Sequence, residues 1–110
     1  MKKILVLAAA AFVVAACAAS GTNIEMLSKS TVGGMTTNDV AAYYRDSNQK
    51  LLDQLVFDNG SQNYDNYVNV FNNMDGDLTA MSTVKTSKDD YYQKLKTVVN
   101  KYRAQIKQLK

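Results

Sequence analysis

The side chain whose type and position most clearly suggest chemistry is the thiol of Cys17, the single cysteine of this 110-residue chain. A thiolate is a nucleophile, so this group can be modified covalently. Cys17 lies at the end of an apolar run, residues 4–16, which follows Lys2 and Lys3. The run is shorter than the roughly 20 residues that a helix needs to cross a hydrocarbon core. A positive start followed by a short apolar stretch is instead typical of a secretory signal.

The segment Val14-Ala15-Ala16-Cys17 resembles the lipobox of bacterial lipoproteins, in which an aliphatic residue and two small residues precede a cysteine. This resemblance covers residues 1–17. It implies that diacylglycerol, with acyl chains such as palmitate, is attached to Cys17 and that the chain is cut just before it. We therefore expect residues 1–16 to be a signal peptide and the mature protein to be lipid-anchored in the cell envelope. Ala18 is not acidic, which implies the outer membrane in a Gram-negative cell.

Two other interpretations of Cys17 stay open. It can be a cysteine that happens to lie in an apolar segment, or a free thiol left after ordinary cleavage at Cys17-Ala18-Ala19. An unpaired thiol is a liability in an oxidising compartment, and a single cysteine cannot form an intramolecular disulfide. Acylation removes that liability, so we prefer the lipoprotein interpretation.

Catalytic and metal chemistry have few candidate residues. The chain contains no histidine, which removes the commonest general base and metal ligand. The glycine-rich phosphate-binding motifs and the nucleophile-elbow motif are also missing. The segment Asp75-Gly76-Asp77 invites comparison with an EF-hand, but Phe71 and Ser82 occupy the positions of its outer acidic ligands. We expect no enzyme activity, no metal site and no cofactor beyond the lipid on Cys17.

The charge of the chain does not indicate a nucleic-acid partner. The full sequence has 13 Lys and Arg against 10 Asp and Glu, a net charge of +3. Loss of Lys2 and Lys3 with the leader leaves a net charge of about +1, which is too small for the basic footprint of a nucleic-acid-binding protein. An exported protein also rarely meets nucleic acid, so we expect none.

Behind the leader, the sequence predicts one small all-α domain. Residues 17–37, from the lipidated Cys17 onward, are rich in Ser, Thr, Gly and Asn, so we expect a flexible tether, although Met26-Leu27 can pack on the domain. From residue 38 the apolar residues recur with a helical period, and the chain has no proline. We expect helices at 38–57, 61–84 and 88–109, folded as an up-down-up three-helix bundle over residues 38–110.

Apolar stripes define the expected core. The first helix, capped by Thr37 or Asn38, has Val40, Tyr43, Tyr44, Ser47, Leu51 and Leu55 along one face. The other two helices have heptad stripes, Tyr64, Tyr67, Phe71, Met74, Leu78 and Met81 in the second and Tyr92, Leu95, Val99, Tyr102, Ile106 and Leu109 in the third. Gly76 is unfavourable inside a helix, so the chain can break there into two shorter helices. The second stripe keeps its phase across Gly76, so we prefer one continuous helix. Ser87 is the expected N-cap of the third helix.

The third helix carries the clearest charge pattern. Most of its charged side chains are expected to be solvated surface. On one side of the helix, however, the cationic residues lie near one another and form a candidate basic face for an anionic envelope polymer, a lipid or an acidic protein: Lys96, Arg103, Lys107 and Lys110.

Together these features favour a membrane-anchored, non-catalytic accessory lipoprotein whose helical bundle contacts another envelope protein. One alternative is a structural lipoprotein that self-associates as a homo-oligomer and contacts peptidoglycan. Lys101-Tyr102-Arg103 and a final Lys110 are similar to the end of the murein-linked major outer-membrane lipoprotein, which implies a wall linkage at Lys110. That family is a single long helix ending close to its Lys-Tyr-Arg, unlike this chain. A second alternative is a small-ligand binder, which would need a cavity.

Overall fold

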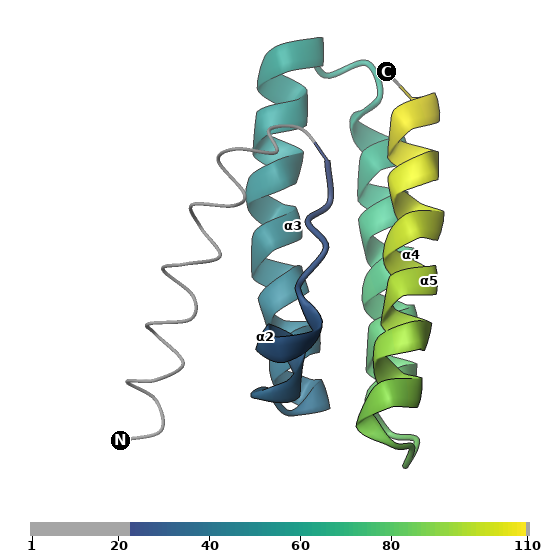
Figure 1. Ribbon diagram of the computed structural model, residues 1–110. Helices are drawn as coiled ribbons and strands as arrows, with labels where there is room; N and C mark the ends of the chain where they lie inside the picture. Colours follow the sequence, from purple (N-terminus) through teal and green to yellow (C-terminus); the bar gives the residue numbers. More distant parts are fainter. Residues whose placement is uncertain (1–22, 110) are drawn as a thin grey trace.

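The computed structural model describes residues 23–109, and this part of the chain is helical, without strands (Figure 1). A short helix, α2 (Lys29–Gly33), precedes three long ones, α3 (Thr37–Asn59), α4 (Tyr64–Ser82) and α5 (Lys88–Gln108). The long helices run up, down and up, with α4 packed against both α3 and α5 (Figure 1). The predicted all-α, up-down-up bundle is therefore confirmed. The second helix is shorter at both ends than the expected 61–84.

Helix α3 begins one residue earlier than the sequence pattern predicts because Thr36, rather than Thr37 or Asn38, is its N-cap. The Thr36 hydroxyl accepts a hydrogen bond from the Asp39 N–H at 3.0 Å, and the Asp39 carboxylate accepts one from the Thr36 N–H at 3.2 Å. This reciprocal capping box satisfies two backbone donors that the helix itself leaves unpaired. The helix ends at Gly60, whose φ of 81° reverses the chain where a side chain would be strained.

The predicted features of α4 and α5 are found in place. The Ser87 hydroxyl caps α5 by accepting a hydrogen bond from the Asp90 N–H at 3.1 Å. Helix α4 passes through Gly76 without interruption, as its unbroken heptad phase predicts. Gly76 is exposed. A glycine inside a helix lowers helix stability by about 1 kcal/mol relative to alanine, and α4 nevertheless continues through it.

The core follows the predicted stripes with shifts of one residue. Tyr64 was expected on a seam but is 45% exposed, because it is the first residue of α4 and lies at the end of the bundle. On α5, Tyr91 is buried and Tyr92 only half-buried, and on α3 Asn48 is buried in place of the expected Ser47. A straight helix drifts about 20° per heptad, so the buried face extends onto neighbouring positions. The buried side chains of α4 and α5 are Tyr67, Val70, Phe71, Met74 and Leu78, and Tyr91, Leu95, Val99, Tyr102 and Ile106.

The extended segment of residues 24–28, here called the N-terminal strap, is the main departure from the sequence prediction. Ile24 and Leu27 are almost fully buried, and Val32 of α2 joins the same core. The strap lies between α3 and α5, which make little backbone contact with each other (Figure 1). Met26 and Leu27 pack on the bundle, as their apolar character allowed, but the expected flexible tether is wrong for the rest of residues 24–36. These residues close the open side of the bundle.

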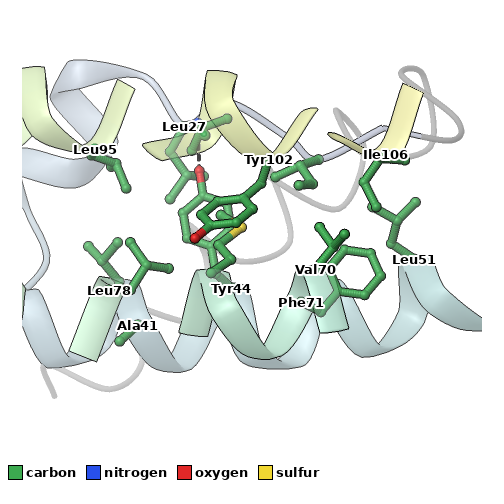
Figure 2. Packing of buried hydrophobic residues seen from close by; sticks show 14 of the residues in the cluster. Leu27, Ala41, Tyr44, Leu51, Val70, Phe71, Leu78, Leu95, Tyr102 and Ile106 are labelled. Atoms are coloured by element: carbon green, nitrogen blue, oxygen red, sulfur yellow. Dashed lines mark hydrogen bonds between the residues drawn. The ribbon is translucent and has the colours of Figure 1, made fainter. Parts of the chain in front are cut away.

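The Tyr44 hydroxyl holds the middle of the strap from the α3 side. It accepts a hydrogen bond from the Leu27 N–H at 3.3 Å and donates one to the Glu25 carbonyl at 2.8 Å. Figure 2 shows this hydroxyl pointing at Leu27 within the core. The neighbouring Tyr43 hydroxyl donates to the Glu25 carboxylate at 2.7 Å. Side chains of one helical turn thus bond both the backbone and the acidic side chain of the strap.

Helix α5 holds the strap from the other side. The Tyr92 hydroxyl donates to the Leu27 carbonyl at 2.9 Å, and the Arg103 Nε donates to the Ile24 carbonyl at 2.5 Å. Buried peptide groups need hydrogen-bond partners, and an isolated extended segment has no neighbouring strand to supply them. Tyrosine hydroxyls and one guanidinium take that place.

We expect Tyr44→Phe to lower the free energy of unfolding by roughly 2–4 kcal/mol, because the Leu27 N–H and the Glu25 carbonyl would both lose a partner in a buried place. Urea denaturation measures the change. The matched control is Tyr64→Phe, which removes an exposed hydroxyl that has no partner among the described residues and should change stability by less than about 0.5 kcal/mol. Equal, small effects of the two substitutions would contradict the role given to Tyr44.

Candidate interaction surface

Two of the site residues predicted from the sequence, Cys17 and Lys110, lie outside the described residues. The same holds for the lipobox residues that precede Cys17. Within residues 23–109, no helix combines the length and the apolar character needed to cross a bilayer.

The predicted basic face of α5 is partly engaged in the fold. Arg103 is half-buried and bonds the strap through its Nε atom. The Lys96 ammonium lies 5.8 Å from the centroid of the Tyr92 ring, in a cation–π contact. Lys107 is exposed in the last turn of α5, where a cation favours the helix dipole. Of the predicted set, Lys107 is thus the described member most available to a partner.

The acidic segment around Gly76 is held by cations and a tyrosine. Asp75 pairs with Arg45 at 3.1 Å, and Asp77 accepts a hydrogen bond from the Tyr102 hydroxyl at 2.6 Å. The Lys101 ammonium lies 3.6 Å from the Asp77 carboxylate. The pKa of Lys101 is raised, mainly by the neighbouring Tyr102 hydroxyl and secondly by Asp77. Over residues 23–109 no three acidic, histidine or cysteine side chains come together in a metal-binding cluster. The two aspartates therefore serve interhelical contacts.

A groove of about 270 Å³ lies between α3 and α4. Its unusual member is Asn48, which is only 5% exposed. The Asn48 Nδ2 contacts the Met74 sulfur at 3.4 Å, whereas its Oδ1 has no hydrogen-bond partner within the described part of the chain. Asn48 lies four residues after Tyr44 and three before Leu51. This helical spacing is the sequence signal that places it on the buried face. The groove is lined by Arg45, Asn48, Gln49, Leu52, Tyr64, Val68, Phe71, Asn72 and Asp75.

A smaller apolar pocket of about 160 Å³, here called the end pocket, lies where α4 turns into α5. The Tyr91 hydroxyl beside it is buried and has no hydrogen-bond partner among residues 23–109. Burial raises the pKa of Tyr91 to about 12, so the phenol is neutral at ordinary pH. The end pocket is lined by Ala80, Met81, Val84, Thr86, Tyr91 and Lys94.

Comparisons of the chain with protein-family models, curated proteins and solved structures found no match.

The buried phenols predict a loss of stability in alkali. Burial raises the pKa values of Tyr44 and Tyr91 in the folded protein, whereas an unfolded chain releases such protons near pH 10. The folded state then binds more protons than the unfolded state. We therefore expect a melting temperature that is constant up to about pH 9 and falls steadily above about pH 10.

Circular dichroism melting at several pH values measures this dependence. Tyr91→Phe removes one of the phenols whose pKa burial raises, so the decline in melting temperature should be shallower in that variant, while Tyr44 and Tyr102 retain part of it. A melting temperature that stays constant well above pH 10 would show that these phenols ionise as easily in the fold as in the unfolded chain.

Proposed function

We propose that this chain is a small lipoprotein of the bacterial cell envelope, held on a membrane by an acylated Cys17 and acting as a non-catalytic interaction module. The observation that carries this proposal is the segment Val14-Ala15-Ala16-Cys17 behind a short basic and apolar leader. Ala18 favours the outer membrane in a Gram-negative cell. Two or three acyl chains on one cysteine would make the attachment stable, whereas a single chain is marginal.

The position of the strap supports a short distance between the anchor and the bundle. The described fold begins at Asn23, and the next residue, Ile24, is already buried between α3 and α5. Six residue steps separate Asn23 from Cys17, a span of at most about 20 Å. A bundle attached in this way would stay close to the bilayer and would meet partners at the membrane surface.

The proposed partner is another protein of the cell envelope that contacts the outer surface of the helices. Within the predicted basic face, Lys107 and Lys96 are the described members that do not bond the strap, since Arg103 is engaged with it. An acidic protein surface or an anionic envelope polymer would complement such a face.

Cys17→Ser should release the chain from membranes, because the acyl acceptor is lost. Membrane flotation of cells that express the full chain tests this, and the intact mass of the membrane-extracted wild-type chain should match Cys17–Lys110 plus a diacylglycerol. Ser20→Ala is the matched control and should float like the wild type. A Cys17→Ser chain that still floats, or a wild-type mass without lipid, would contradict the proposal.

The small-ligand alternative has one observation in its favour: the groove between α3 and α4 is lined by the buried Asn48, whose Oδ1 has no hydrogen-bond partner among residues 23–109. Buried polar atoms without partners are uncommon, and a donor group on a ligand would satisfy this one. Envelope glycans supply such groups. An NMR titration with soluble peptidoglycan fragments would follow the Asn48 side-chain amide: a saturable shift would support this second function, and an unchanged signal would remove it.

A further inference from the structure

The most exposed large apolar side chain among residues 23–109 is Phe57, in the last turn of α3. Its side chain is 85% exposed. Asp53 lies four residues earlier, which places it on the same side of the helix. Within the described chain the Asp53 carboxylate forms no hydrogen bond or ion pair. Phe57 and Asp53 are here called the Phe57 knob. They place an exposed aromatic ring beside a carboxylate that has no partner among the described residues.

The end pocket has the opposite properties. Its volume of about 160 Å³ is close to the roughly 150 Å³ of an apolar cavity that holds benzene in another protein. Lys94 lies at its edge, exposed, and its ammonium forms no ion pair or hydrogen bond with other described residues. The pocket thus offers space for one ring beside a free positive charge.

The knob and the pocket of one molecule cannot meet. Phe57 lies near the turn between α3 and α4, and the end pocket lies at the turn between α4 and α5 (Figure 1). The 19 residues of α4 separate these turns, a length of about 27 Å at the rise of an α-helix. Only a second molecule can bring a knob to the pocket.

We propose that the Phe57 ring of one copy of this chain inserts into the end pocket of the next copy, with Asp53 facing Lys94. A single exposed phenylalanine is ordinary on a protein surface and by itself indicates nothing. The proposal depends on the agreement of size and of charge between the two ends. Because the two surfaces differ, the contact is heterologous: each copy keeps one free knob and one free pocket, and copies join in rows.

Such a contact is too small to hold free molecules together. One ring and one ion pair bury far less surface than a stable interface, and association must also offset the lost freedom of both partners. Copies confined to one membrane have a much higher effective concentration, which favours weak contacts. This step rests on the proposed membrane anchoring. The chain is accordingly monomeric in dilute solution and forms rows on a membrane.

The test uses a chain whose residues 1–17 are replaced by a histidine tag, bound to phosphatidylcholine vesicles that contain nickel-chelating lipid. The described core lies wholly after Asn23, so this replacement leaves it intact. A photoreactive benzoylphenylalanine replaces Phe57. Illumination should give crosslinked dimers, trimers and higher multiples on vesicles and monomers in solution, with the crosslink in the peptide that contains Met81 and Val84. The same probe at Ala42, exposed at the other end of α3, should give monomers.

The charges provide the matched variants. Lys94→Asp and Asp53→Lys should each lower the yield of multiples about tenfold, because each one places like charges together. Both substitutions in one chain should restore the yield. Circular dichroism confirms that each variant is folded.

Three results would overturn the contact: no multiples on vesicles, dimers joined through position 57 of both copies, or a double variant that stays as low as the single ones. The nickel lipid replaces Cys17 in this experiment, so its failure would count against the contact alone. Flotation of the Cys17→Ser chain would count against the proposed anchoring alone.

Discussion

The buried backbone of residues 24–27 is the constraint on which this bundle depends. An extended segment between two helices has no neighbouring strand, so its peptide groups must find side-chain partners. Tyr44 and Tyr92 supply them from opposite sides, and both bond Leu27. A phenylalanine at either position would fill the same space and leave a polar group unpaired. Because α3 and α5 touch each other little, the strap also sets how far apart they stand.

Several charged side chains of α5 contact the N-terminal segment rather than solvent alone. Arg103 bonds the Ile24 carbonyl, and near the start of the helix Lys88 bonds the Gly33 carbonyl while Asp89 pairs with Lys29. Arg103 of the predicted basic face, together with Lys88 and Asp89 outside it, therefore fastens the N-terminal residues to the bundle. What remains exposed is scattered, which favours small, specific contacts over a broad electrostatic surface.

The sequence predicts what local patterns determine. Heptad stripes and the absence of proline give three helices, and Ser87 gives the start of α5. Packing of Met26-Leu27 on the bundle was suggested by their apolar character, but the path of the strap could not be predicted, because its partners lie far along the chain: Tyr92 lies 65 residues from Leu27. Asn48 was missed because a buried polar residue breaks the apolar pattern. The proposed lipidation of Cys17 rests on the sequence alone, whereas the Phe57 knob and the end pocket appear only once exposure is known.

The N-terminal strap is an integral part of the folded bundle, and the exchange rate of the Leu27 amide hydrogen reports on this. This amide is buried and donates to the Tyr44 hydroxyl. Amides of a cooperative core exchange only when the core opens. We predict that the Leu27 amide exchanges as slowly as that of Leu55, in the buried face of α3. Exchange of Leu27 at the rate of an unfolded chain, with Leu55 still protected, would show that the strap is detached while the bundle stays folded.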